Sequence, residues 1–201
     1  MLKKIYLLVQ SFIYILFIYM DFTYQNSSAI KYCGIIINFI FSLYLYFRKE
    51  NYSILFVIAL FLTTVADYFL LVKDSCYSIG VACFCIVQLL YAYKISRFST
   101  FPIRMIVIVL LIFFLPLFQQ ERSILNILAI ISFVNLTVNV IACMLNKQNK
   151  LFIAFILFWL CDLSVGIYNL QIPLVDKFCA YSMWIFYFPS QILLTLSGEE
   201  Q

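Results

Sequence analysis

Two aspartates lie inside long apolar segments of the chain, where a carboxyl group is expensive to keep. Asp67 is preceded by an apolar run that begins near residue 52, and Asp162 by one that begins near residue 151. An ionised aspartate at the centre of a bilayer costs at least about 2.5–3.5 kcal/mol on insertion scales. Such a residue is kept where it faces a partner, a bundle interior or water. We therefore take Asp67 and Asp162 as the candidate catalytic residues.

The chemistry that these two residues could perform is acid–base hydrolysis. Two carboxyl groups in one dry site cannot both ionise cheaply, so one is expected to hold its proton near neutral pH. A protonated acid beside an ionised carboxylate is the usual equipment for general acid–base catalysis. The alternative interpretation is that each aspartate only hydrogen-bonds a neighbouring helix. The chain contains no histidine, which excludes Ser–His and Cys–His nucleophile systems and the common zinc sites. We predict neither a metal nor a cofactor.

Further polar side chains fall on helical stripes. Gln88 and Tyr91 are three residues apart in one apolar segment, and Tyr187 and Gln191 are four apart in another, so each pair shares a helix face. Asn135 belongs to a third stripe. Each stripe taken singly is better explained as hydrogen bonding between helices. Several segments that each bring polar groups inward indicate a shared polar cavity instead.

The composition selects the membrane class for the elements that must position these residues. Of the 201 residues, 66% are hydrophobic and 11% are charged, whereas a soluble domain carries about 25% charged residues. The net charge of +4 is spread thinly over the connections, which does not form the basic stripe of a nucleic-acid binder. We expect a single integral membrane domain over residues 1–201, with a membrane lipid as its partner and no nucleic acid.

Eight apolar runs are visible, and each must be helical because backbone polar groups in lipid have to be paired within their own segment. Strands of an outer-membrane barrel would be shorter and half polar. The runs are Ile5 to Met20, Ala29 to Phe47, Tyr52 to Val72, Cys76 to Ile95, Ile103 to Phe118 with Pro116 near its end, Ser123 to Leu145, Leu151 to Leu170, and Phe178 to Ser197. The sequence thus predicts an all-α polytopic membrane protein, a bundle of about eight transmembrane helices.

The basic residues predict how this bundle is oriented. With eight spans, nine of the 13 lysines and arginines fall on the side of the chain ends and four on the other. Basic residues are enriched in cytoplasmic connections, so both termini are predicted to be cytoplasmic. The two aspartates lie four spans apart, which gives their spans the same direction. This offset suggests two parallel four-helix halves.

Four short patterns resemble one protein family. The third run ends Leu62-Thr-Thr-Val-Ala-Asp67, and the fourth has the spacing Gly80-x-x-x-Phe84-x-x-x-Gln88-x-x-Tyr91. The seventh run contains Phe158-Trp-Leu-Cys-Asp162-Leu, and the eighth contains Tyr187-Phe-Pro-Ser-Gln191. In this order and layout the chain resembles the YhhN-like lysoplasmalogenase family. Ala66 and Gln88 stand where the family usually has glycine and histidine, and glutamine can hydrogen-bond but cannot shuttle a proton at neutral pH.

The resemblance implies a hydrolase that cleaves the vinyl ether bond of a lysoplasmalogen, a lysophospholipid, and releases a fatty aldehyde. An acid protonates the β-carbon of the vinyl ether, and a carboxylate can stabilise the resulting oxocarbenium ion and steer water onto it. Asp67 and Asp162 would divide these two roles. Side chains that would orient water or the headgroup are Gln88, Tyr91, Asn135, Tyr187 and Gln191.

Three other functions fit parts of the sequence. A small-molecule or proton-coupled transporter would also use intramembrane acids, although four glycines are few for broken helices. An intramembrane aspartyl protease would pair two aspartates, but its flanking motifs do not occur around Asp67 and Asp162. An accessory membrane protein without turnover would be compatible with Ala66 and Gln88.

Overall fold

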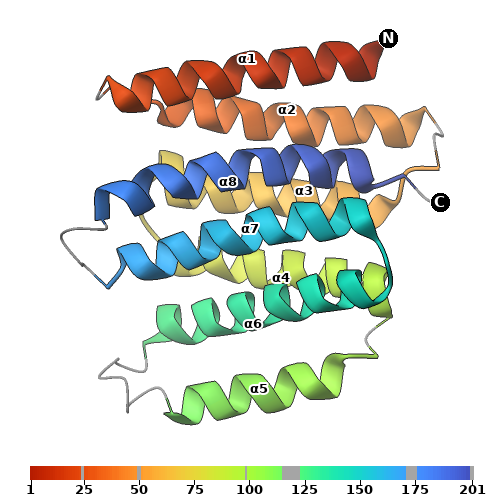
Figure 1. The fold of residues 1–201 in the computed structure, drawn as a ribbon, viewed down its shortest axis with the longest axis vertical. Helices are drawn as coiled ribbons and strands as arrows, with labels where there is room; N and C mark the ends of the chain where they lie inside the picture. The colour runs from red at the N-terminus through yellow and green to blue at the C-terminus, as the bar shows by residue number, and fades with distance from the viewer. Residues whose placement is uncertain (24, 49–50, 98, 115–122, 171–175, 200–201) are drawn as a thin grey trace.

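The computed structural model of the chain is a helical bundle and confirms the predicted fold class (Figure 1). It describes residues 1–201 except 24, 49–50, 98, 115–122, 171–175 and 200–201. The described residues form eight helices, with one π-helical turn, η1, after the third. Their bounds are α1 Leu2–Phe22, α2 Ser28–Phe47, α3 Ile54–Asp67, η1 Tyr68–Val72, α4 Tyr77–Ser96, α5 Phe101–Phe114, α6 Ile124–Leu145, α7 Asn149–Tyr168 and α8 Asp176–Ser197.

Six of the helices in the described residues are long and apolar enough to cross a membrane: α1, α2, α3 with η1, α4, α6 and α7. The helix α8 has 22 residues but is not among them, and it carries four buried polar side chains, Ser182, Ser190, Gln191 and Thr195. Apolar α5 has only 14 residues, fewer than the roughly 20 that a span needs. Its predicted continuation to Phe118, with Pro116, lies outside the described residues.

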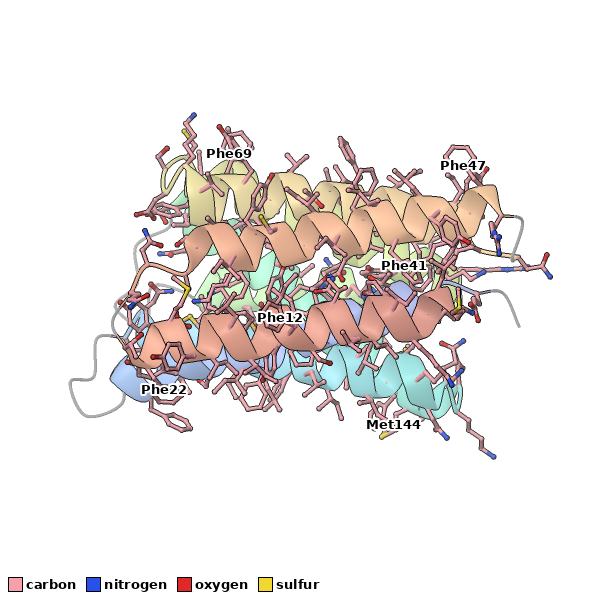
Figure 2. All side chains as sticks on the ribbon, turned by 90° about the horizontal axis from the view of Figure 1, so that it is seen from above. Phe12, Phe22, Phe41, Phe47, Phe69 and Met144 are labelled. Carbon is pink, nitrogen blue, oxygen red and sulfur yellow. The ribbon has the colours of Figure 1, made fainter. Side chains whose placement is uncertain are left out.

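The outer surface of the bundle is greasy, as lipid contact requires. Figure 2 shows aromatic side chains projecting from the helices. Phe12 is 65% exposed and Phe47 is 74% exposed, which in water would be a large unfavourable apolar area. This surface and the apolar helices together make the chain an all-α membrane protein.

The order in which helices contact one another repeats along the chain. In the first half α1 packs on α2, α2 on α3 and α3 on α4, and in the second half α5 packs on α6, α6 on α7 and α7 on α8. The halves meet mainly where the fourth helix of one packs on the second helix of the other, α4 on α6 and α8 on α2, and α8 also contacts α1 and α3. In Figure 1, α1 and α5 lie at opposite edges of the bundle, and the two termini lie at the same end. This arrangement matches the predicted parallel halves.

Polar contacts hold α1 against α2 within the greasy bundle. Both Gln10 Nε2, at 2.7 Å, and the Tyr6 hydroxyl, at 2.6 Å, donate hydrogen bonds to Asn38 Oδ1. Gln10 Nε2 also donates to the Gly34 carbonyl oxygen at 2.9 Å. These groups are buried, and such bonds replace the hydrophobic driving force that lipid removes.

The end of α3 is where the backbone departs from a regular α-helix. Asp67 is the last α-helical residue, and the chain continues as the π-helical turn Tyr68–Val72. Single π-helical turns inside α-helices occur frequently at functional sites. Gly80 of α4 allows this segment a close approach, because a Cβ atom at residue 80 would lie 2.6 Å from Leu70 Cγ and 3.1 Å from the Ala66 carbonyl oxygen. The π-helical turn and the close contact with Gly80 together set the position of Asp67 at the end of α3.

Candidate functional site

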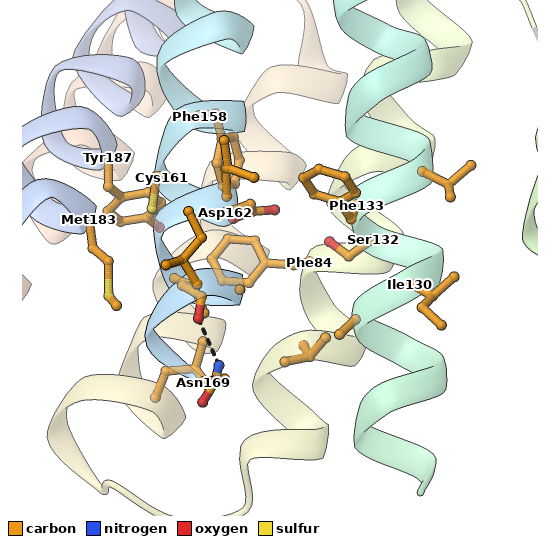
Figure 3. Close-up of a pocket in the computed structure, with 18 of the residues that line it drawn as sticks. Phe84, Ile130, Ser132, Phe133, Phe158, Cys161, Asp162, Asn169, Met183 and Tyr187 are labelled. Carbon is orange, nitrogen blue, oxygen red and sulfur yellow. Dashed lines mark hydrogen bonds between the residues drawn. The ribbon is translucent and has the colours of Figure 1, made fainter. Parts of the chain in front are cut away.

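A cavity of about 560 Å³ lies between the helices α3, α4, α6, α7 and α8, and Leu111 of α5 contributes to its edge. This volume falls within the range of roughly 300–1,000 Å³ that small-molecule sites occupy. Most of its wall is apolar, and Figure 3 shows several of its residues. The carboxyl, hydroxyl and carboxamide groups in the wall belong to Asp67, Ser132, Asp162, Asn169 and Tyr187. Both predicted catalytic aspartates therefore line one cavity.

Asp67 is held by a tyrosine from the last helix. The Asp67 side chain is buried, and its Oδ2 accepts a hydrogen bond of 2.6 Å from the Tyr187 hydroxyl. The Tyr187 ring is fixed by edge contacts with Phe158 of α7, at a centroid distance of 5.5 Å, and with Trp184 of α8, at 5.2 Å. The Asp67 carboxyl is therefore held in one orientation, because the tyrosine that donates to it is itself fixed by aromatic packing.

Asp162 has a different environment. It lies on α7, and in Figure 3 its carboxyl group points across the cavity toward Ser132 of α6. No side chain or backbone N–H of the described residues donates a hydrogen bond to it. Within the described residues, the site thus contains one carboxyl with a donor and one without.

Of the five residues predicted to bind the substrate, Tyr187 is the one found among the lining residues that the structure describes. Gln88 lies behind the wall, where its carbonyl oxygen and Oε1 accept hydrogen bonds of 3.0 and 3.1 Å from Asn139 Nδ2. Asn135 faces α5, and its Oδ1 accepts a hydrogen bond of 3.1 Å from Arg104. The polar stripes on α4 and α6 therefore join these helices to each other and to α5.

Tyr91 and Gln191 are also packed behind the cavity. The Tyr91 ring lies between Phe56 and Phe155, with both centroid distances 5.2 Å. Gln191 is fully buried one turn beyond Tyr187, and its Nε2 donates to Ser190 Oγ at 3.4 Å. The Tyr91 hydroxyl, Gln191 Oε1 and Gln88 Nε2 have no hydrogen-bond partner among the described residues, which is unusual for buried polar atoms.

Four aromatic residues of the cavity wall were not among the predicted site residues. Phe84, Phe133, Phe158 and Trp184 all line it. Phe84 had a signal in its spacing of four residues from Gln88. Phe158 had one in its spacing of four residues from Asp162. Phe133 and Trp184 had none, because aromatic residues in a membrane chain are explained equally well by contact with lipid.

The cavity reaches the outer surface along α7. Its lining includes the exposed residues Leu163, Val165 and Leu170. Gly166 also lines it, and a Cβ atom at residue 166 would have no neighbouring atom within 4 Å. The lining continues to Asn169 and Leu170 at the end of α7, away from both chain termini. A membrane-dissolved molecule could therefore enter from the side of the bundle.

Arg104 is a buried cation outside this cavity. Its side chain is 1% exposed, and its guanidinium donates to the Asn135 carbonyl oxygen at 2.9 Å, to Asn139 Oδ1 at 2.8 Å and to Thr100 Oγ1 at 3.0 Å. The sequence pattern assigns Arg104 to the basic residues at the cytoplasmic side. In the structure it lies within the first turn of α5 and ties that helix to α6.

No lysine or arginine in the described part of the chain lines the cavity. Within the same residues, no group of three or more His, Cys, Asp and Glu side chains could hold a metal ion. The chain matches no protein-family model, no curated protein and no solved structure. The groups that the site offers are two carboxyl groups and one tyrosine hydroxyl in the mostly apolar wall of a cavity large enough for a small molecule.

Proposed function

We propose that this chain is a membrane-embedded hydrolase that cleaves the vinyl ether bond of lysoplasmalogens by acid–base catalysis with Asp67 and Asp162. The observation that carries the proposal is that both carboxyl groups, from two different helices, line one apolar cavity. The order of the motifs around Asp67, Gln88, Asp162 and Tyr187, which resembles the YhhN-like lysoplasmalogenase family, supports the same reaction.

The environments of the two carboxyl groups favour a division of roles. Asp67 accepts a hydrogen bond from Tyr187, and a carboxylate is the form that such a donor stabilises. Asp162 has no donor among the described residues and sits in an apolar wall, where a neutral carboxyl costs less than a charge. We assign Asp162 as the acid and Asp67 as the carboxylate.

The reaction then runs in three steps: proton transfer to the vinyl ether, addition of water and breakdown of the hemiacetal. The Asp162 carboxyl transfers its proton to the β-carbon of the vinyl ether, which leaves an oxocarbenium ion at the α-carbon. Water adds to that carbon and loses a proton to Asp67, which gives a hemiacetal. Asp67 then returns this proton to the leaving ether oxygen while Asp162 takes the hemiacetal hydroxyl proton, so the hemiacetal breaks into a fatty aldehyde and the free alcohol of the glycerophospho-base and both carboxyl groups regain their starting states. Asp67 also stabilises the oxocarbenium ion while it lasts.

The proposed topology places the cavity in the non-cytoplasmic half of the membrane. The end of the bundle that carries both termini also carries Lys3, Arg48, Lys94 and Lys147, and basic residues favour the cytoplasmic side. The apolar wall and the opening along α7 suit the hydrocarbon chain of a single-chain lipid. Such a substrate would enter sideways from the bilayer.

The test is release of fatty aldehyde from a lysoplasmalogen by the purified protein in lipid nanodiscs. Asp67→Asn and Asp162→Asn should each lower the rate by roughly 10²–10⁴-fold, the usual contribution of a general acid or base. Asp74→Asn is the matched control, because Asp74 is exposed outside the helices. A saturated alkyl ether analogue should not be cleaved. Full activity in both aspartate variants would remove the proposal, and solute flux into liposomes without aldehyde release would favour a transporter.

A further inference from the structure

Aromatic rings and carboxyl groups share the wall of the cavity. The rings of Phe84, Phe158 and Tyr187 pack edge to face, with centroid distances of 5.7 Å between Phe84 and Phe158 and 6.3 Å between Phe84 and Tyr187. Asp67 and Asp162 are part of the same wall. The π-face of an aromatic ring attracts a cation, and so does a carboxylate. Both kinds of group therefore favour a positively charged ligand.

One lysine among the described residues already lies between a carboxylate and aromatic rings. Lys31 of α2 is 7% exposed, and its Nζ lies 2.8 Å from Asp21 Oδ2. The same Nζ lies 5.0 Å from the ring centroid of Trp184 and 5.4 Å from that of Phe17. Trp184 belongs to the cavity wall as well. Among the described residues, the cavity has the carboxyl groups and the rings but no lysine or arginine.

We propose that the cavity binds a lipophilic organic cation, such as an ammonium or phosphonium ion with apolar substituents, and that Asp162 releases its proton to water and becomes the counter-ion of that cation. Asp162 is the free partner, because Asp67 is already bonded to Tyr187. The proposal goes beyond ether hydrolysis and does not depend on it, since binding requires the charge of one aspartate and no turnover.

The same wall argues against other ligands. An anion held between the two aspartates would face the Asp67 carboxylate, with no basic side chain among the described lining residues to balance it, and like charges at close range repel. Ca²⁺ needs six to eight oxygen ligands and Mg²⁺ a near-ideal octahedron, whereas this wall is mostly apolar. A bulky cation needs neither, because its apolar substituents can rest against the rings and the aliphatic side chains.

The cavity has room for such a ligand near its mouth. Its volume is about 560 Å³, and the space next to Gly166 is open, with no neighbouring atom within 4 Å of the position of a Cβ. A side chain at residue 166 would therefore start in open space at the lining of the cavity. Substitution at this glycine tests whether a ligand occupies the cavity, independently of either aspartate.

The experiment measures binding of tetraphenylphosphonium to the purified protein in an uncharged detergent, by equilibrium dialysis or calorimetry. We expect saturable binding with one ion per chain, and weaker binding of triphenylphosphine oxide, which has similar rings but no net charge. Asp162→Asn should weaken tetraphenylphosphonium binding by roughly 100-fold, as loss of a close ion pair in a poorly solvated site predicts. Asp74→Asn should leave it unchanged.

Gly166→Phe should also abolish saturable binding while the variant remains helical and monodisperse. Unchanged affinity in either Asp162→Asn or Gly166→Phe, or no saturable binding to the wild-type protein, would overturn the proposal. Aldehyde release is measured without the cation, so the binding experiment can still be interpreted if the protein releases no aldehyde. A failure of cation binding likewise leaves the hydrolase assay readable.

Discussion

The hydrogen bond between Tyr187 and Asp67 offers a measurement of the charge on Asp67 in the folded protein. The bond is 2.6 Å long, both side chains are buried, and it joins α8 to α3. A hydrogen bond to a charged group contributes about 1.5–3 kcal/mol to stability. Neutral bonds between membrane helices average about 0.6 kcal/mol, with a maximum near 1.7 kcal/mol. If Asp67 is the carboxylate that we assign, the coupling energy between the two side chains should fall in the higher range.

The perturbation is a double-mutant cycle with Asp67→Ala and Tyr187→Phe, and the assay is the free energy of unfolding in mixed micelles at neutral pH. A second cycle in the same chain is the control. The Tyr6 hydroxyl donates to Asn38 Oδ1 at the same distance, 2.6 Å, and both residues are buried. Asn38 is neutral at every pH, so Tyr6→Phe with Asn38→Ala should give about 0.6 kcal/mol.

The comparison decides between two states of Asp67. Replacing Asp67 with asparagine keeps a neutral acceptor, so the coupling to Tyr187 should fall to the level of the control cycle. The reasoning is refuted if the Asp67–Tyr187 coupling is no larger than the Tyr6–Asn38 coupling. Asp67 would then be a neutral acid in the folded protein, and the two catalytic roles would have to be exchanged.

Two further predictions concern packing around the site. Gly80→Ala should be less stable than Gly166→Ala by about 1–3 kcal/mol, the usual cost of overpacking. The new methyl group meets Leu70 at residue 80 but open space at residue 166. Equal unfolding free energies for the two variants would contradict the close contact between α4 and η1. Arg104→Met should lower the free energy of unfolding by about 1–3 kcal/mol, because it leaves buried hydrogen-bond acceptors unpaired. It should also speed hydrogen exchange in α5, because α5 contacts α6 and no other helix among the described residues. Arg104→Lys should recover little of this stability, since an ammonium group cannot reproduce the forked hydrogen bonds of the guanidinium. Hydrogen exchange in α5 of Arg104→Met as slow as in the wild type would refute the anchoring role of Arg104.

The sequence was a good guide to the aspartates because the cost of a charge in lipid does not depend on the details of packing. A carboxyl in an apolar run must face inward, and the offset of four spans put Asp67 and Asp162 on helices with equivalent neighbours. Both of these inferences follow from chain direction and hydropathy alone. The shared cavity is the result that hydropathy could not supply, since it depends on the shapes of the surrounding side chains.

The sequence was a weaker guide to the polar stripes. Helical periodicity shows which residues share a face, but not which helix covers that face. Asn135 is on the same stripe as Ser132, yet Ser132 lines the cavity and Asn135 meets Arg104 of α5. The π-helical turn after Asp67 also changes the helical register, and nothing in Tyr68–Val72 marks it in the sequence. The sequence places Arg104 near the start of its run, but it could not show that the side chain is buried against α6.

The position of α8 has a consequence for how the protein is made. The last helix packs against α1, α2, α3 and α7, and Gly34 of α2 leaves space for the Phe188 ring, which would otherwise clash with a Cβ atom. Beyond it, the Ser53 N–H donates to the Gly198 carbonyl oxygen at 2.8 Å. During synthesis the first three helices leave the ribosome long before α8 does. Until then Asp67 lacks the tyrosine that orients it, so the arrangement of the cavity wall around Asp67 is completed only when the final helix enters the membrane.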